Sequence, residues 1–407
     1  MLNWEDIFAT RSSRMKASEI RELLKLLDRP DIISFAGGIP DPALFPDQEF
    51  KTAYADIFSG SAVNAALQYS VSEGYKPLRE WLAGEMGKLG IGCTADNVFI
   101  VSGSQQGLDY LGKLFLSPGD TALVTWPTYL GALQAFNAYE PAYDQLTLNG
   151  NRTPDSYRTV AQEAGGRVKF AYLSADFSNP TGETVDRAGR EKLLDLAEEL
   201  DVAVIEDAAY QSLRYDGEAV PPILALELAR KGGNINATRT IYCGSFSKTL
   251  APGLRVGFIV ANADIIRKLV LMKQAADLHS STINQMAIAL VAERGFEAQV
   301  KKIKAAYSKR RDAMLEALGK YMPEGVRWTR PEGGMFIWVT LPEGFDGADL
   351  LAKAIERKKV AFVPGKAFHA DGSGANTFRI SFSCADEKMI DEGISRLGAL
   401  IREEMAA

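Results

Sequence analysis

The sequence predicts an α/β protein, in which a large domain with a mostly parallel sheet is followed by a smaller α+β domain. Between residues 95 and 260, short apolar runs alternate with stretches of helical periodicity. Several of these runs are apolar at every position, which is typical of strands buried on both faces of a sheet. From about residue 325 the pattern of strand-like runs changes, and two helical stretches lie among them, which indicates a second domain.

The elements can be justified in order along the chain. Apolar spacing predicts an amphipathic helix over residues 18–27, and a loop rich in Gly and Pro then ends at Pro46. The predicted strands of the sheet are NVFIV (97–101), ALVT (122–125), VKFAYL (168–173), VAVIE (202–206), TIYCG (240–244) and VGFIV (256–260). Residues 262–320 favour helix, with a break at Gly295. The second domain contains VRWT (326–329), MFIWVTL (335–341), VAFVP (360–364) and TFRISFS (377–383), with helices LLAKAIERK (350–358) and from 386 onward.

Composition and charge exclude several classes of protein. The chain has 407 residues, of which 46% are hydrophobic and 24% charged, as in ordinary globular proteins. Its net charge of −6 disfavours binding to nucleic acid or to an anionic membrane. We find no apolar run long enough for a transmembrane helix and no signal peptide. The three cysteines are far apart, which argues against a disulfide framework or zinc site, and we expect a cytoplasmic protein.

Other chemistries lack the residues that they need. The only histidines, His279 and His369, are too few for a histidine-rich metal site, and packing is the more common role for each. The chain has neither the GxSxG motif of a serine hydrolase nor a Walker A motif. Residues 103–107 are glycine-containing but lack the GxGxxG spacing of a dinucleotide site.

Polar residues follow the predicted strands at the edge of the sheet where ligands bind in α/β proteins. Ser104 and Gln105 open a helix after the first strand, where backbone N–H groups and the positive helix end favour an anion. Tyr129 follows the second strand and offers a ring for stacking. The remaining strand ends carry Asn179 in a SNPTG turn, Asp207 with Tyr210, and Ser245 with Ser247 and Lys248, and Arg255 lies seven residues beyond that lysine.

Each of these residues also has an ordinary structural explanation. Ser104 could cap a helix, the turn at Asn179 could be only a turn, Asp207 could be a helix cap, and Lys248 could be a surface lysine. Five successive strand ends with this set of groups favour instead one planar, phosphate-bearing ligand. Pyridoxal 5′-phosphate fits, because its aldehyde requires an amine and its ring nitrogen requires a carboxylate that keeps it protonated. Hydroxyl groups and a guanidinium suit its phosphate.

Longer motifs connect the chain to a known family. These are ASEIRELLKLL (17–27), ISFAGGIPDPALFP (33–46), LQYSVSEGYKPLR (67–79), VSGSQQGLD (101–109), SNPTG (178–182), EDAAY (206–210), GSFSKTLAPGLRVGF (244–258), KQAADLHSSTINQ (273–285), RPEGGMFIW (330–338) and AFVPGKAF (361–368). With them the chain resembles the class I/II, fold-type I aminotransferases that depend on pyridoxal phosphate, and most of all the 2-aminoadipate/kynurenine branch. The resemblance implies a seven-stranded, mostly parallel sheet and transfer of an amino group to a 2-oxo acid such as 2-oxoglutarate.

The resemblance also implies roles for individual residues. Lys248 would hold the cofactor covalently and move the Cα proton, while Asp207 would pair with the ring nitrogen. Tyr210 and Asn179 would bind the ring oxygen, and Tyr129 would stack on the ring. The phosphate ligands would be Ser104, Gln105, Ser245, Ser247, Arg255 and, from the second subunit of a homodimer, Tyr69. We expect at least one of the bonds Trp126–Pro127 and Asn179–Pro180 to be cis.

The substrate would be bound by another set of residues. Arg379 would bind the α-carboxylate, and in TFRISFS it alternates with apolar residues on a rigid strand; its alternative role is that of a surface arginine. Asn179 and Gly38 would also line the substrate site. The segment 278–282 contains no arginine for a distal carboxylate, which argues against aspartate as the substrate. Arg21 on the N-terminal helix is the candidate for selecting dicarboxylic substrates, and its alternative is a solvated helix residue.

Three parts of the chain are expected. Residues 1–45 would form an arm and helix that belong to the small domain and the substrate lid, 46–304 the large cofactor-binding domain, and 305–407 the small domain. Three alternatives to an aminotransferase remain open. A binder of sugar phosphates or nucleotides without pyridoxal phosphate would have no use for Lys248. A lyase or decarboxylase on the same fold would share every cofactor residue. A ligand-sensing module like those of MocR regulators would require a DNA-binding domain, whereas here the family pattern begins near residue 10.

Overall fold

The computed structural model describes residues 3–15 and 31–406. A seven-stranded sheet forms the centre of the large domain, in the order β2-β8-β7-β6-β5-β3-β4. Its strands are β2 (Val98–Val101), β3 (Thr121–Val124), β4 (Ala142–Gln145), β5 (Val168–Leu173), β6 (Ala203–Asp207), β7 (Thr240–Ser245) and β8 (Gly257–Val260). Only β8 runs against the others, because it pairs antiparallel with both β2 and β7. This confirms the predicted α/β fold with a mostly parallel sheet.

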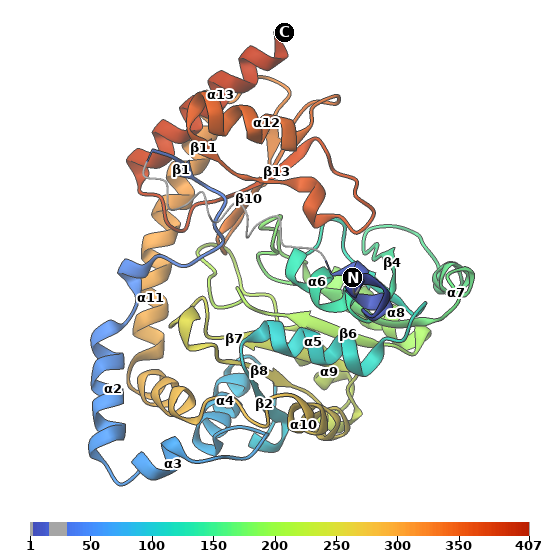
Figure 1. Ribbon diagram of the computed structural model, residues 1–407, viewed down its shortest axis with the longest axis vertical. Helices are drawn as coiled ribbons and strands as arrows, with labels where there is room; N and C mark the ends of the chain where they lie inside the picture. The colour runs from blue at the N-terminus through green and yellow to red at the C-terminus, as the bar shows by residue number, and fades with distance from the viewer. Residues whose placement is uncertain (1–2, 16–30, 407) are drawn as a thin grey trace.

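Helices cover both faces of this sheet, which explains the apolar runs of its strands. One face packs against α5 (Ser104–Phe115), α6 (Leu130–Asn137) and α10 (Ala263–Ala276). The other face packs against α4 (Lys76–Lys88), α7 (Pro154–Glu163), α8 (Arg187–Leu200), α9 (Ile223–Arg230) and the first half of α11 (Thr282–Tyr321). The helices α2 (Asp47–Ser59) and α3 (Val63–Leu67) lie beside α11 (Figure 1).

Local sequence accounts for where several helices begin and bend. Asp186, Asn262 and Asp386 each accept a hydrogen bond from the backbone N–H three residues later, at the starts of α8, α10 and α13 (Glu387–Met405). Gly295 interrupts the regular backbone of α11 at φ −165° and ψ 21°, as predicted. The long α11 continues past this point into the small domain, along the left side of Figure 1.

The strand β4 was not predicted, because its sequence, AYDQ, is not an apolar run. It lies at the edge of the sheet beyond β3 and is only half-buried. An edge strand packs on fewer neighbours than a central one, so its sequence carries a weaker apolar signal.

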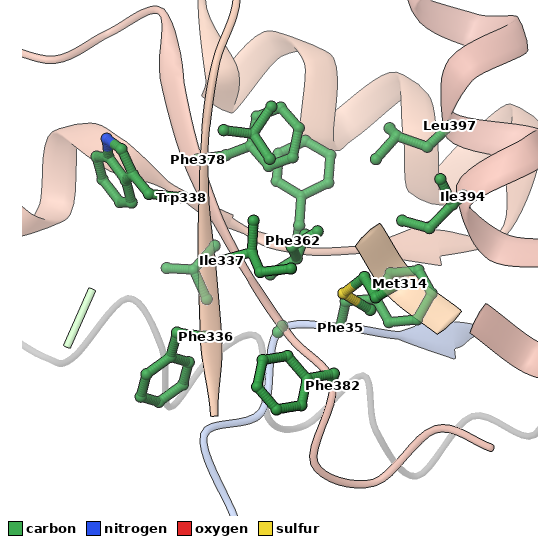
Figure 2. Close-up of a cluster of buried hydrophobic side chains, with 14 of the residues drawn as sticks. Phe35, Met314, Phe336, Ile337, Trp338, Phe362, Phe378, Phe382, Ile394 and Leu397 are labelled. Carbon is green, nitrogen blue, oxygen red and sulfur yellow. The ribbon is translucent and has the colours of Figure 1, made fainter. Parts of the chain in front are cut away.

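The small domain contains a four-stranded sheet in the order β12-β13-β10-β9. The strands are β9 (Arg327–Trp328), β10 (Phe336–Thr340), β12 (Val363–Pro364) and β13 (Thr377–Ser381), covered by α12 (Gly347–Lys353), a π-helical turn at Ala354–Lys358 and α13. The segment after the undescribed residues joins this domain, since β1 (Ile33–Ser34) pairs in parallel with β11 (Val360–Ala361). Figure 2 shows the aromatic core, with Phe35 of that segment packed among side chains of β10, β13, α11 and α13.

The division into domains at residues 45 and 304 remains a prediction.

Short 3-10 turns complete the described elements. They lie at Trp4–Asp6, Thr10–Arg14, Pro42–Leu44, Ala95–Asn97, Ile235–Ala237, Pro252–Leu254 and Gly365–Phe368. The bonds Trp126–Pro127 and Asn179–Pro180 are both cis, which confirms that expectation. Within the described part of the chain, no helix combines the length and the apolar character needed to cross a bilayer.

Candidate active site

The polar residues predicted from the strand ends surround one cavity of about 160 Å³ at the carboxyl edge of the large sheet. They come from the loops that follow β2, β3, β5, β6 and β7. The lining residues are Ser104, Gln105, Tyr129, Ser174, Asn179, Asp207, Ala209, Tyr210, Ser245, Ser247, Lys248, Pro252 and Arg255. All of the cofactor residues predicted within this subunit are therefore neighbours in space.

Lys248 presents a buried amine to the cavity. Its Nζ donates a hydrogen bond of 2.8 Å to the carbonyl oxygen of Gly38. Burial, with the nearby cations of Arg379 and Arg255, lowers the pKa of Lys248 to about 8. A large share of this amine is therefore neutral near pH 8, whereas a surface lysine is almost wholly charged. The alternative of an ordinary surface lysine is wrong.

Asp207 lies at the end of β6 and is buried. Its carboxylate accepts hydrogen bonds from the Tyr172 hydroxyl at 2.8 Å and from the backbone N–H of Ala209 at 3.3 Å. Burial raises the pKa of Asp207, since a charged carboxylate is poorly solvated there. A cation facing this carboxylate would offset that effect, and a protonated ring nitrogen is such a cation.

The loop after β2 forms a cradle for an anion. Gly103 precedes α5 with φ 83°, and a Cβ at this position would lie 2.2 Å from Nη2 of Arg255. A Cβ on Gly257 would lie 2.7 Å from the backbone nitrogen of Ser104. Glycine at 103 leaves room for the guanidinium of Arg255 beside this turn, and glycine at 257 lets β8 lie directly against the start of α5. The N-cap residue is Gly103, so the alternative role of Ser104 as the helix cap is wrong.

The other phosphate and ring candidates lie around the same space. The Ser245 hydroxyl accepts a hydrogen bond from the backbone N–H of Ser247 at 3.1 Å. The side chain of Gln105 donates to the carbonyl oxygen of Gly131 at 2.6 Å. The backbone of Gln105 belongs to the first turn of α5. Burial raises the pKa of Tyr129 to about 12, so this phenol stays neutral. Ring, hydroxyl, guanidinium and helix N-terminus together fit pyridoxal phosphate.

Arg379 of β13 is almost completely buried, so the alternative of a surface arginine is wrong. Its Nη1 donates to Oδ1 of Asn179 at 2.7 Å, and its Nη2 donates to the carbonyl of Ala36 at 2.8 Å. The guanidinium carbon lies 4.3 Å from the ring centre of Phe336 and 5.1 Å from that of Phe368. Figure 2 shows Phe336 at one end of β10, of which it is the first residue.

The charge and the free donor of Arg379 suit a carboxylate. Burial lowers the pKa of Arg379 to about 10, so the side chain remains a cation at neutral pH. Its Nε has no hydrogen-bond partner within the described residues. A buried donor without a partner costs free energy, which a bound carboxylate would recover.

Three predicted residues lie elsewhere or contribute differently. Tyr69 is 79% exposed and does not line the cavity; its ring makes an edge contact with His279 at 6.1 Å. Gly38 contributes its carbonyl to Lys248, and a Cβ there would lie 2.9 Å from the ring of Phe336. Arg21 and the predicted helix over residues 18–27 lie outside the described residues.

Sequence reasoning missed Tyr172, Ser174 and the carbonyl of Ala36. Tyr172 lies within the apolar run VKFAYL, where its ring appeared to be part of the core. Burial raises the pKa of Tyr172 well above its ordinary value, so its hydroxyl keeps the proton that it donates to Asp207. A phenol inside a buried strand is a usable signal, because a buried hydroxyl usually has a hydrogen-bond partner. The carbonyl of Ala36 gives no such signal, because every residue has a backbone carbonyl.

A family model described as aminotransferase class I and II matches residues 31–397, which include this site. The chain belongs to the class I and II aminotransferases. Like the family it resembles, this transaminase has the fold-type I architecture, and the donor set of its cavity fits the cofactor of that class.

Similar proteins are known from several thermophiles. An aromatic-amino-acid aminotransferase of Thermococcus litoralis is 43% identical, over 99% of this chain and 96% of its own. A 2-aminoadipate transaminase of Thermus thermophilus is also 43% identical, over 100% of this chain and 99% of its own. The crystal structure of a kynurenine aminotransferase from Pyrococcus horikoshii superimposes with a TM-score of 0.91 at 44% identity, covering 100% of this chain and 99% of its own.

Proposed function

We propose that this aminotransferase uses pyridoxal 5′-phosphate to move an amino group from an L-amino acid to a 2-oxo acid in a ping-pong reaction. The proposed donors are 2-aminoadipate and aromatic or branched-chain amino acids, and the proposed acceptor is 2-oxoglutarate. One observation carries the proposal: the buried amine of Lys248 and the buried carboxylate of Asp207 line the same cavity. The similar proteins named for aromatic, aminoadipate and kynurenine substrates support the range of donors.

Lys248 and Asp207 have different roles in the proposed reaction. Pyridoxal phosphate, when bound, supplies an aldehyde that takes up the amino group and a ring that withdraws electrons from the substrate Cα. Lys248 would hold the cofactor and, as a free amine, would remove the Cα proton at Nζ and return it. Its lowered pKa makes the neutral amine available for that task. Asp207 would face the ring nitrogen and stabilise its protonated form.

Binding and orientation fall to the remaining side chains. The guanidinium of Arg379 takes the substrate α-carboxylate beside Asn179, which places the Cα near Lys248. Ser104, Gln105, Ser245, Ser247 and Arg255 hold the phosphate. Each charge-assisted contact contributes about 1.5–3 kcal/mol, so several of them retain the cofactor while Lys248 is free.

Tyr69 is proposed to complete the phosphate site of a second subunit in a homodimer. The side chains near it in sequence are exposed and apolar, with Leu67 at 67% and Val71 at 57%, which suits a surface covered by another copy. Tyr69→Phe would then weaken retention of the cofactor in the dimer. A protein that sediments as a fully active monomer would exclude this part of the proposal.

We propose that Arg21, on the predicted N-terminal helix, favours dicarboxylic amino donors. Arg21→Ala should lower kcat/KM for glutamate or 2-aminoadipate by about 1.5–3 kcal/mol, the contribution of a charge-assisted hydrogen bond, and change leucine and phenylalanine little. Equal losses for both kinds of donor would assign Arg21 to helix support alone.

The test of the function is direct. The purified protein is incubated with pyridoxal phosphate, reduced with borohydride and digested, and the labelled peptide should be the one that contains Lys248. Amino donors are then screened spectrophotometrically against 2-oxoglutarate. Production of glutamate with the matching 2-oxo acid supports the proposal. Decarboxylation or elimination without any need for an acceptor would indicate a lyase on the same fold.

A further inference from the structure

Behind the anion cradle lies a polar cluster, centred on the buried Lys273, that does not reach the cavity. It consists of Ser102, Gln106, Lys273 and Asp277, and none of these side chains is among the lining residues. Lys273 is in the last turn of α10 and its side chain is fully buried. Its Nζ donates to both carboxylate oxygens of Asp277, at 3.0 and 3.1 Å, and to Oε1 of Gln106 at 2.8 Å.

The cluster is connected to the loop between β2 and α5. Oε1 of Gln106 also accepts the backbone N–H of Ser102 at 2.8 Å, and Nε2 of Gln106 donates to Asp277 at 2.8 Å. The hydroxyl of Ser102 donates to Asp277 at 3.1 Å. These bonds hold both ends of the turn that contains Gly103, whose following residues Ser104 and Gln105 face the cavity.

A fully buried lysine needs a reason, even though its partner Asp277 is partly exposed. Burying a lysine costs free energy, and an apolar side chain of similar size in its place is often no less stable. A fully satisfied polar network does, however, hold its members in one arrangement. Here the members include the strand end and the first helical turn that carry the backbone N–H groups of the anion cradle.

We infer that Lys273 and Asp277, acting through Gln106 and Ser102, are positioning residues that set the geometry of the phosphate cradle at the start of α5. This inference rests on the proposed function, because the phosphate is that of the proposed cofactor. The cluster touches neither ring nor substrate, so its effect is specific to the phosphate. A ligand that lacks the phosphate therefore serves as its internal control.

The experiment compares four ligand-free proteins by isothermal titration calorimetry: the native chain and the variants Lys273→Met, Gln106→Leu and Arg152→Met. The probes are inorganic phosphate, pyridoxamine 5′-phosphate and pyridoxamine, none of which has an aldehyde for Lys248. Gln106→Leu removes the hydrogen bond to the backbone N–H of Ser102 but leaves the pair of Lys273 and Asp277, and the Ser102 hydroxyl bond to Asp277, intact. Arg152→Met breaks a different, partly buried ion pair, with Asp144 of β4, and serves as the matched control.

Lys273→Met and Gln106→Leu should each raise the Kd for phosphate and for pyridoxamine 5′-phosphate about tenfold and leave that for pyridoxamine unchanged. Arg152→Met should lower the melting temperature without changing any Kd. If Lys273→Met fails to fold, Gln106→Leu still decides the matter.

Two results would overturn the inference while leaving the proposed function in place. Unchanged phosphate binding in Gln106→Leu would show that the cradle does not depend on the cluster. Equal weakening of pyridoxamine and its phosphate would show that the cluster only supports the fold. If the native chain bound neither phosphorylated probe, the proposed function would be wrong and the inference with it.

Discussion

The two halves of the site contain buried cations of different kinds. Lys248, in a loop of the large domain, has an amine whose pKa falls to about 8, so it can lose its proton near neutral pH. Arg379, in the middle of a small-domain strand, keeps its charge although burial lowers its pKa to about 10. The difference suits a division of labour, in which the cation that can be neutralised performs the chemistry and the permanent one binds the substrate.

The surroundings of the two residues differ in the same way. Lys248 lies on a loop among residues that other strand ends contribute, and its amine donates a hydrogen bond to the carbonyl of Gly38. Arg379 is fixed on a strand by two hydrogen bonds and by the rings of Phe336 and Phe368. A catalytic amine has to move between partners, whereas a binding group works best when its direction is fixed in advance.

The largest effect on turnover is expected from loss of the Lys248 amine. Lys248→Ala should lower kcat for transamination by about 10⁴-fold, the upper range for a general acid–base group, and abolish borohydride labelling. The protein should still bind the cofactor, because the phosphate ligands remain. Lys268→Ala on the exposed side of α10 is the control and should behave as the native chain. Near-native turnover without Lys248 would remove it from the chemistry.

The next largest effect is expected at the carboxylate opposite the amine. Asp207→Ala should lower kcat by about 10²–10³-fold, as the loss of a preorganised electrostatic group does, with a smaller change in cofactor affinity. Turnover is compared with the dissociation constant for pyridoxamine 5′-phosphate. A variant that turns over normally would show that another group manages the ring nitrogen.

The variant Arg379→Gln tests the half of the site that binds the substrate. This change should lower kcat/KM for amino acids by about 1.5–3 kcal/mol, mostly through KM, because it removes a charge-assisted contact with the carboxylate. Labelling of Lys248 by borohydride should persist. Arg327→Gln, on the exposed strand β9 of the same small sheet, provides the control. A pure loss of kcat would mean that Arg379 takes part in the chemistry, and the two halves would not be separate.

The smallest effect concerns the coupling of the two cations. In the cofactor-free protein, the reactivity of the Lys248 amine toward an amine-specific reagent should rise with pH around a midpoint of about 8, since only the neutral amine reacts. Arg379→Gln should move this midpoint to higher pH, because a neighbouring positive charge that disfavours protonation has been removed. The midpoint is measured by labelling and peptide mapping. No shift, or a shift to lower pH, would show that Arg379 does not lower the pKa of Lys248.

The sequence by itself determined the α/β class, the places of most strands and the cofactor half of the site. Apolar runs mark strands that are buried on both faces, and the residues that follow them lie at one edge of a parallel sheet. Ser104, Tyr129, Asn179, Asp207 and Lys248 could therefore be grouped from their order along the chain. The edge strand β4 gave no such signal, since its side chains are only partly buried and its sequence is not an apolar run.

Only the tertiary structure decided what surrounds those residues. The hydroxyl of Tyr172 meets Asp207 from a neighbouring strand, and the carbonyls of Ala36 and Gly38 reach Arg379 and Lys248 from a segment more than 200 residues away. The downward shift in the pKa of Lys248 likewise depends on burial and on two arginines that approach it in space. Contacts of this kind join distant segments through packing, and local sequence pattern records only what each segment does by itself.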